Sequence, residues 1–191
     1  PYLCHVLTRY GYLDEAYLLL GREEYPSWLY PVKQGATTIW ERWDGQKPDG
    51  TFQDVGMNSF NHYAYGAIGD WMYRVMAGID TDEAAPGYKH ILIQPRPGGG
   101  FTEVKASHET PYGKVASAWT RKDGTFDLRV EVPANTHATV RLPTAQIGNV
   151  TEGGQPLTAV KGVSAKQDGD TVVVDVGSGA YRFAYPMGDA K

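Results

Sequence analysis

The segment "GATTIWERWDG", residues 35–45, contains the first candidates for chemistry in this sequence. It places an ionisable Glu41 between Trp40 and Trp43. Aromatic side chains usually lie in cores or on binding surfaces, and a carboxylate avoids apolar surroundings unless it has a partner or a function. Aromatic faces could stack on a sugar ring while the carboxylate reaches a water molecule or a hydroxyl group. The alternative is that both tryptophans are core residues and that Glu41 pairs with Arg42 or another cation.

His62 is the second candidate and lies in the stretch "SFNHYAYG". The sequence predicts a long helix that is capped by Ser59, ends near Gly78 and has an apolar stripe of Phe60, Ala64, Ala67, Trp71 and Val75. His62 would then lie in the first turn, where the positive helix end disfavours an imidazolium. A neutral, hydrogen-bonding ring is therefore expected. The alternative is a partly buried histidine that satisfies a backbone group.

The remaining polar residues predict no metal site and no cofactor. Asp44, Asp49 and Asp54 gather in one loop, but their spacing fits no EF-hand, so ordinary solvated acids are expected. The other histidines show no metal-ligand spacing, and the sequence contains no phosphate-binding loop or nucleophile elbow. The single cysteine, Cys4, excludes an intrachain disulfide and a cysteine-based zinc cluster.

The two halves of the chain differ in composition. Residues 1–90 hold four of the five tryptophans and ten of the thirteen tyrosines, and they are the more acidic half. This difference predicts a domain boundary near residues 85–90, with domains at residues 1–88 and 89–191, and the helical and alternating patterns of the two halves predict an α+β protein. The aromatic, acidic half is the expected place for a small-molecule site.

The first half has helical periodicity. One helix is expected to carry Leu3, Val6, Leu7 and Tyr10 and to end at Gly11, and a second is expected over residues 14–20. The stretch "PSWLYPV" predicts a third, short helix with Pro26 in its first turn. A Gly-rich loop without periodicity follows the Trp-Glu-Arg-Trp motif. Long irregular loops in compact domains are often functional.

The second half alternates apolar and polar residues. The apolar positions are Phe126, Leu128, Val130 and Val132, then Ala138, Val140 and Leu142, then Val172, Val174 and Val176, then Tyr181, Phe183 and Tyr185. Such alternation predicts antiparallel strands with one buried face, and several short strands suggest a β-sandwich. Asp123-Gly124 predicts one hairpin turn, and "GSGA" at residues 177–180 predicts another. Trp119 is expected in the core.

The overall charge and hydropathy exclude several classes of protein. The formal net charge of −4 gives no basic footprint for nucleic acid. No apolar run approaches the length of a membrane-spanning helix, so a soluble chain with no membrane partner is expected. The sequence begins in an apolar, helix-like stretch without a signal peptide, so it is expected to begin inside a domain, and the compartment is left open.

Three blocks carry a resemblance to a known family. "PSWLYPVKQGATTIWERWDG", "SFNHYAYGAIGDWMYRVMAGI" and "PGYKHILIQPRPGG" resemble the C-terminal part of bacterial α-L-rhamnosidases of glycoside hydrolase family 78. The blocks occur in the family's order, and the resemblance runs from about residue 2 to about residue 143. It implies the C-terminal portion of an (α/α)6 toroid followed by an antiparallel β-sandwich.

The resemblance also implies residue roles. Glu41 would be the general base of an inverting glycosidase, and His62 would contact the bound rhamnose. Trp40 and Trp43 would shape the wall around Glu41 or pack beneath the site. The general acid would lie outside these residues, so the chain alone is expected to be inactive. The implied partners are rhamnose-containing glycosides or polysaccharides and the remainder of the catalytic domain.

Two functions of other classes compete with the enzyme. The sandwich could be a carbohydrate-binding module, although it is poor in tryptophan, and an exposed row of aromatic side chains on one sheet face would support that role. It could also be a structural domain that supports the toroid, which is the role favoured for residues 89–191 within the enzyme.

Overall fold

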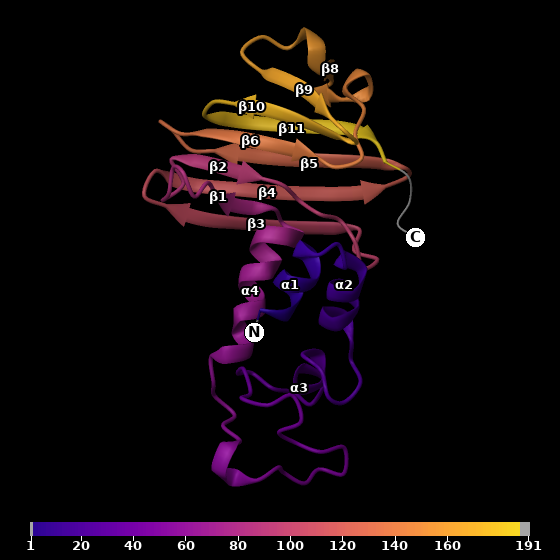
Figure 1. Ribbon diagram of the computed structural model, residues 1–191, viewed down its shortest axis with the longest axis vertical. Helices are drawn as coiled ribbons and strands as arrows, with labels where there is room; N and C mark the ends of the chain where they lie inside the picture. Colours follow the sequence, from indigo (N-terminus) through magenta and orange to yellow (C-terminus); the bar gives the residue numbers. More distant parts are fainter. Residues whose placement is uncertain (1, 188–191) are drawn as a thin grey trace. The chain divides into compact units, whose positions relative to one another are not determined.

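The computed structural model describes residues 2–187 and is shown in Figure 1. Its internal contacts divide the chain into two compact units, Pro1–Trp71 and Met72–Lys191. Helices dominate the first unit and β-strands dominate the second. The predicted fold class, a helical part followed by an antiparallel sandwich, is therefore confirmed.

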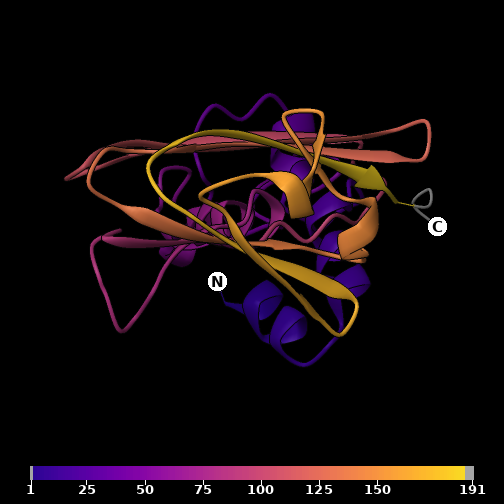
Figure 2. The same cartoon turned by 90° about the horizontal axis from the view of Figure 1, so that it is seen from above.

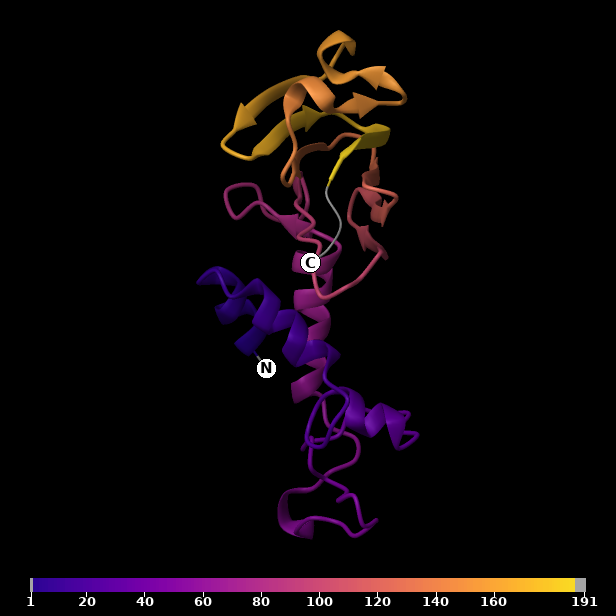
Figure 3. The same cartoon turned by 90° about the vertical axis from the view of Figure 1, so that its right-hand side faces the viewer.

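Short helical segments make up the regular structure of the first unit. They are α1 (Leu3–Arg9), α2 (Leu13–Gly21), α3 (Leu29–Lys33), η1 (Val55–Met57), η2 (Ala64–Ala67) and α4 (Ile68–Trp71), where η1 and η2 are 3₁₀ helices. Helices α1 and α2 pack side by side (Figure 3). Both were predicted, and Gly11, with φ +89°, follows the first.

Helix α1 turns a different face inward from the one that its apolar spacing suggests. Its buried residues are Cys4 and Thr8, whereas Leu3, Val6 and Tyr10 are exposed. The cause is tertiary, because Cys4 packs on α2 and the Thr8 hydroxyl accepts a hydrogen bond from the indole N–H of Trp71 at 2.9 Å. Helical spacing predicts the element correctly but does not identify the buried face.

The third helix begins later than predicted. Pro26 precedes α3 instead of occupying its first turn, and the helix starts at Leu29. The hydroxyl oxygen of Ser27 accepts a hydrogen bond from the backbone N–H of Tyr30 at 3.0 Å. This serine lies two residues before the helix and satisfies one of its first free N–H groups.

The long helix predicted from Ser59 is shorter at its N-terminal end, so that part of the prediction is wrong. Helical structure begins at Ala64 with η2 and continues in α4, and the second unit opens with a π-helix, η3 (Met72–Met76). Residues 59–62 are not helical, and the backbones of Ser59 and His62 hydrogen-bond instead to those of Glu41 and Ile39. The helical stretch ends before Gly78, as expected.

The second unit is a sandwich of two sheets, which Figure 2 shows as two layers. The five-stranded sheet has the order β1 (Ile79–Thr81), β2 (His90–Ile93), β6 (His137–Leu142), β10 (Thr171–Val176) and β9 (Ser164–Asp168). The six-stranded sheet has the order β3 (Glu103–Thr110), β4 (Gly113–Lys122), β5 (Thr125–Val132), β11 (Gly179–Pro186), β7 (Thr151–Glu152) and β8 (Gln155–Pro156). Neighbouring strands are antiparallel except β2 and β6. Two 3₁₀ turns, η4 (Ile147–Asn149) and η5 (Leu157–Ala159), interrupt the later strands.

The predicted alternation describes the core of the sandwich. The apolar residues of β5, β6 and β10 that were singled out from the sequence are buried, and so is Phe183 on β11. Trp119, at 1% exposure, also lies in this core, as predicted. Its indole N–H donates a hydrogen bond to the carbonyl oxygen of Met76 at 2.7 Å, so its polar atom is satisfied.

The two predicted turns have different outcomes. Asp123 and Gly124, with φ of +51° and +70°, form the tight turn between β4 and β5, as predicted. The prediction of a hairpin at residues 177–180 is wrong. Strand β10 pairs with β6 and β9, whereas β11 pairs with β5 and β7, so this segment crosses from one sheet to the other.

Strand β1 belongs to the sandwich although it precedes the composition change near residue 88. It pairs with β2, and Ile79 lies opposite Ile93. The compact units consequently divide between Trp71 and Met72. The domain ranges 1–88 and 89–191 stay predictions. Amino-acid composition alone does not determine which strands pair, so it does not fix a domain boundary.

Candidate active site

The candidate residues Glu41 and His62 lie on two chain segments of the first unit that are hydrogen-bonded to each other. The backbone N–H of Glu41 donates to the carbonyl oxygen of Ser59 at 2.8 Å, and the N–H of His62 donates to the carbonyl oxygen of Ile39, also at 2.8 Å. The Thr38 hydroxyl adds a bond to the backbone of the second segment. Residues far apart in sequence are thereby held on neighbouring strands of chain.

The carboxylate of Glu41 is held by the backbone and not by a cation. Its Oε2 accepts a hydrogen bond from the N–H of Ser59 at 2.8 Å, and the side chain is partly buried. The side chain of Arg42 is turned to Asp44, which accepts two hydrogen bonds at 2.9 and 3.0 Å. The proposed pairing of Glu41 with Arg42 is therefore replaced by an Arg42–Asp44 pair.

The Arg42–Asp44 pair is part of a small polar network. The bidentate hydrogen bond from Arg42 holds the pKa of Asp44 below its ordinary value, although partial burial opposes this shift. The same hydrogen bond raises the pKa of Arg42. Gln53 donates a further hydrogen bond to Asp44 at 2.9 Å. This network joins the motif that carries Glu41 to the loop that follows it.

The Gly-rich loop after the motif is more ordered than its sequence suggests. The backbone N–H of Gln53 and the side-chain amide of Asn58 both donate to the carbonyl oxygen of Gly45, at 3.1 and 2.9 Å. Gln46 and Phe52 form a β-bridge across the loop. Residues 45–58 therefore form an ordered loop, and hydrogen bonds to Gly45 hold its two ends together.

The carboxylates of the other two loop acids accept hydrogen bonds from residues two positions later in the chain. Asp49 accepts hydrogen bonds from the N–H and hydroxyl of Thr51, and Asp54 accepts one from the N–H of Gly56 at 2.7 Å. Within residues 2–187, no cluster of three or more His, Cys, Asp or Glu side chains is arranged to hold a metal ion.

Trp40 and Trp43 belong to two different aromatic groups. Trp40 is 8% exposed and packs edge-on against Phe60, with ring centroids 4.9 Å apart. Trp43 packs against Trp28 and Tyr65 at 4.6 and 4.9 Å. The wall and packing roles expected for the two tryptophans stay predictions.

The indole N–H of Trp43 has an unusual environment. Its nitrogen is buried and has no hydrogen-bond partner within the described part of the chain. The neighbouring Trp28, in contrast, donates to the carbonyl oxygen of Tyr65 at 3.0 Å. Buried polar groups are normally paired. Trp43 thus retains an unused donor in the aromatic group next to the candidate residues.

His62 lies just before the helix instead of in its first turn. The backbone N–H of Ala64 donates a hydrogen bond to His62 Nδ1 at 3.2 Å. A ring nitrogen that accepts a hydrogen bond carries no proton, so the proton of the neutral imidazole lies on Nε2. With Nδ1 engaged by Ala64, Nε2 is the ring position left to meet a ligand.

Three contributors to this region were not identified from the sequence. They are the backbone N–H of Ser59, the Asp44 carboxylate as the partner of Arg42, and Phe60 beneath Trp40. Asp44 stands two residues after Arg42, which is the only local signal of their pairing. The other two contacts join positions about twenty residues apart, so no local pattern reports them.

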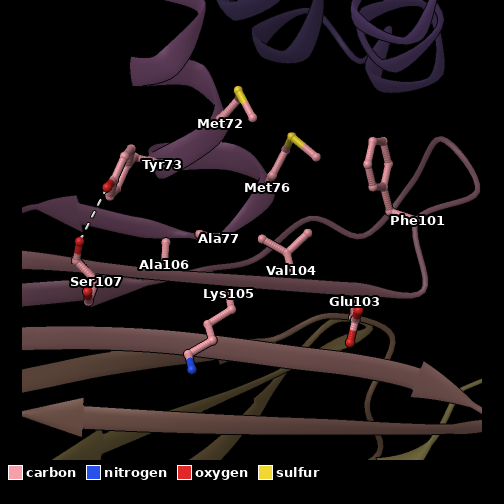
Figure 4. A pocket seen from close by; sticks show the side chains of 10 residues that line it. All are labelled: Met72, Tyr73, Met76, Ala77, Phe101, Glu103, Val104, Lys105, Ala106 and Ser107. Atoms are coloured by element: carbon pink, nitrogen blue, oxygen red, sulfur yellow. Dashed lines mark hydrogen bonds between the residues drawn. The ribbon is translucent and has the colours of Figure 1, made fainter.

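A cavity of about 540 Å³ lies in the second unit, away from these residues in sequence (Figure 4). Figure 4 shows Met72, Met76 and Phe101 around it, next to strand β3. The hydroxyl of Tyr73 donates to the carbonyl oxygen of Ser107 at 3.3 Å at one side. Its lining is mainly apolar. Within residues 2–187, no helix combines the length and the apolar character needed to cross a membrane.

Two family models match the chain in succession. The bacterial alpha-L-rhamnosidase 6 hairpin glycosidase domain matches residues 1–76, and the bacterial alpha-L-rhamnosidase C-terminal domain matches residues 78–155. Glu41 and His62 both fall within the first match. The change from one model to the other lies close to the division between the compact units.

Similar proteins carry the same family name. The alpha-L-rhamnosidase of Streptomyces avermitilis is 43% identical over 183 residues, which cover 96% of this chain and 17% of the relative. An alpha-L-rhamnosidase of Formosa agariphila is 50% identical over 144 residues, which cover 75% of this chain and 15% of the relative. The chain therefore spans less than a fifth of the length of these relatives.

Solved structures give the same result. The structure of Streptomyces avermitilis alpha-L-rhamnosidase complexed with L-rhamnose has a TM-score of 0.83 at 43% identity, covering 95% of this chain and 17% of that one. The alpha-L-rhamnosidase from Dictyoglumus thermophilum has a TM-score of 0.82 at 35% identity, covering 97% and 20%. The order of the two domain matches and these similarities together show that the chain belongs to the bacterial α-L-rhamnosidase family and matches the C-terminal part of its members.

Proposed function

We propose that a full-length protein containing this chain hydrolyses terminal α-L-rhamnosides with inversion at the anomeric carbon, and that Glu41 is its general base. The observation that carries the proposal is the placement of Glu41 and His62 on two hydrogen-bonded segments within the stretch that matches the 6 hairpin glycosidase domain. The named relative with bound L-rhamnose supports rhamnose as the sugar.

The geometry around Glu41 suits a general base. The N–H of Ser59 holds one carboxylate oxygen in place at 2.8 Å, and within residues 2–187 the neighbouring cation Arg42 is hydrogen-bonded to Asp44 instead of Glu41. A base must keep an oriented lone pair for the proton of the attacking water. A carboxylate that is fixed by one backbone donor, in place of a bidentate arginine, retains that capacity.

An inverting glycosidase needs a second carboxyl group. One carboxylic acid protonates the leaving oxygen, while the opposite carboxylate activates water, and the two lie roughly 6.5–9.5 Å apart. The family resemblance assigns the acid to an earlier part of the catalytic domain. This chain would thus supply the base and part of the sugar site, and the substrates would be rhamnose-containing glycosides or polysaccharides.

His62 would contribute a hydrogen bond to the sugar. Because its Nδ1 accepts from Ala64, the free ring position is an Nε2–H donor, which matches the lone pairs of a rhamnose hydroxyl. Trp40 and Trp43 would act less directly. Trp40 packs beneath the segment, and Trp43 keeps its buried N–H available beside it.

The sandwich would serve as a structural domain of the enzyme. Its single tryptophan, Trp119, is buried in the core together with Phe126, Phe183 and Tyr185, whereas Phe101 and Tyr112 are 38% and 40% exposed. Carbohydrate-binding surfaces usually offer exposed aromatic faces. The burial of Trp119 therefore favours a structural role over a carbohydrate-binding module.

The direct test is the stereochemistry of hydrolysis. A full-length protein containing this chain is incubated with 4-nitrophenyl α-L-rhamnoside, and the first-formed sugar is observed by NMR. We expect β-L-rhamnose to form first. Initial formation of the α-anomer would overturn inversion, and the absence of any hydrolysis would overturn the proposed activity. The 191-residue chain alone is the matched control and is expected to be inactive, because it lacks the acid.

A further inference from the structure

The side chains of His62 and Tyr63 are stacked on each other. Their ring centroids are 5.1 Å apart, and the ring planes differ by only 13°. Side chains of consecutive residues point to opposite sides of a strand and do not face each other on a helix. The stack lies where the irregular segment that contains His62 gives way to η2, which begins at Ala64.

Tyr63 is fixed by its backbone although its side chain is open to solvent. Its carbonyl oxygen accepts a hydrogen bond from the N–H of Gly66 at 2.9 Å, which begins η2. Tyr63 as a whole is nevertheless 86% exposed to solvent. A ring that buries so little of itself contributes little to the core of this unit. Its stacking partner is the imidazole, so its effect is expected there.

The imidazole of His62 is held from three directions. Its backbone N–H is bound to Ile39, its Nδ1 accepts the N–H of Ala64, and one ring face is covered by Tyr63. The two hydrogen bonds fix the backbone and the unprotonated Nδ1, but neither prevents the ring from tilting about the Nδ1 contact. The stacked phenol ring supplies that restraint.

We propose that Tyr63 is a positioning residue: its ring holds the imidazole of His62 in the orientation in which Nε2–H meets a hydroxyl group of the bound 6-deoxy sugar. This inference rests on the proposed function, in which His62 contacts rhamnose. The restraint comes from the face of the phenol ring, and the Tyr63 hydroxyl is not needed. Tyr63→Phe should therefore preserve sugar binding, and Tyr63→Ala should not.

A double-mutant cycle on the full-length protein tests this assignment. The affinity for L-rhamnose is measured by titration calorimetry for the wild type, Tyr63→Phe, Tyr63→Ala, His62→Ala and the double alanine variant. An aromatic pair contributes on the order of a two- to tenfold change in an equilibrium constant. We expect Tyr63→Ala to weaken binding by about three- to tenfold and Tyr63→Phe to bind normally.

The decisive comparison is made in the His62→Ala background. If Tyr63 acts through His62, then Tyr63→Ala has no further effect there, whereas additive losses would overturn the inference and indicate a direct sugar contact or a general packing role. Unchanged affinity in Tyr63→Ala would also overturn it. A wild type that does not bind L-rhamnose would refute the proposed function itself. Tyr112→Ala, an exposed tyrosine in the second unit, is the matched control.

Discussion

The carboxylate of Glu41 accepts a hydrogen bond from the backbone N–H of Ser59, and the backbone N–H of Glu41 donates one to the carbonyl oxygen of Ser59. The donor–acceptor distance is 2.8 Å in each case. The two residues therefore exchange hydrogen bonds, with a side-chain oxygen in the place of one main-chain carbonyl. A backbone donor cannot rotate away as a side chain can. The orientation of the carboxylate is thus tied to the pairing of residues 39–41 with 59–62.

Replacing Glu41 by glutamine in the full-length protein should remove turnover and spare sugar binding. The amide keeps the shape and can still accept from Ser59, but it cannot take a proton from water. General base catalysis contributes about 10²–10⁴-fold, so a loss of that size in kcat is expected. The measurement is nitrophenol release from an aryl α-L-rhamnoside.

The matched control for this variant is Glu24→Gln, which changes an exposed glutamate of the same unit. It should leave kcat unchanged. Near-normal kcat in Glu41→Gln would exclude Glu41 as the base. A raised KM with unchanged kcat would assign Glu41 to substrate binding only.

His62→Ala in the full-length protein should weaken the binding of L-rhamnose. The expected cost is about 0.5–1.5 kcal/mol, which is typical for one neutral hydrogen bond. Titration calorimetry in the Glu41→Gln background measures this without turnover. Equal affinities with and without the imidazole would assign His62 to helix initiation through its contact with Ala64 alone.

The Arg42–Asp44 pair should make the loop at residues 45–58 sensitive to acid. The hydrogen bond from Arg42 lowers the pKa of Asp44 in the folded state below its unfolded value of about 3.9. The stabilisation is therefore fully present above that value and is lost as the pH falls through the lower, folded pKa. Amide hydrogen exchange at Gly45 and Gln53 should accelerate across this window.

Asp44→Asn removes the titrating group, so the same amides should exchange faster at neutral pH and show no further acid transition. Asp49→Asn is the control, because Asp49 bonds only to Thr51 at the tip of the loop. An unchanged acid transition in Asp44→Asn would assign the sensitivity to another carboxylate.

Gly78→Ala should destabilise the second unit strongly. Gly78 has φ +79°, and a Cβ at this position would lie 2.1 Å from the nitrogen of Pro95. Gly162 has the same φ of +79° but open space around the position of a Cβ. Strain from φ alone costs about 1–2 kcal/mol, so Gly162→Ala should lose that amount.

The clash adds to the strain at Gly78, and a total loss above about 4 kcal/mol in the free energy of unfolding is expected there. Denaturant unfolding of the two variants measures the difference directly. Equal losses would mean that the backbone of Pro95 moves aside without cost.

Local pattern alone predicted the elements of this protein well. Alternating apolar residues identified β5, β6, β10 and β11, and the Asp123-Gly124 pair identified the tight turn between β4 and β5. These features depend on residues adjacent in sequence, because side-chain direction in a strand has a period of two and a tight turn needs positive φ. The family resemblance also rests on short contiguous blocks.

The partners of those elements could not be read from local pattern. The Gly-rich segment at residues 177–180 has the composition of a hairpin, yet β10 and β11 belong to different sheets. The buried face of α1 was set by α2 and Trp71, not by its apolar spacing. In both cases, the free energy of pairing and burial depends on surfaces that are distant in the chain.

The candidate site divides in the same way. The residue types marked Glu41 and His62 as candidates but left structural alternatives open for both, and the family resemblance implied the roles of general base and sugar contact. Folding decided that Ser59 holds the carboxylate, that Asp44 takes Arg42, and that Trp40 and Trp43 enter separate aromatic groups. Side-chain chemistry is a property of each residue, whereas orientation arises only when segments about twenty residues apart hydrogen-bond and pack together.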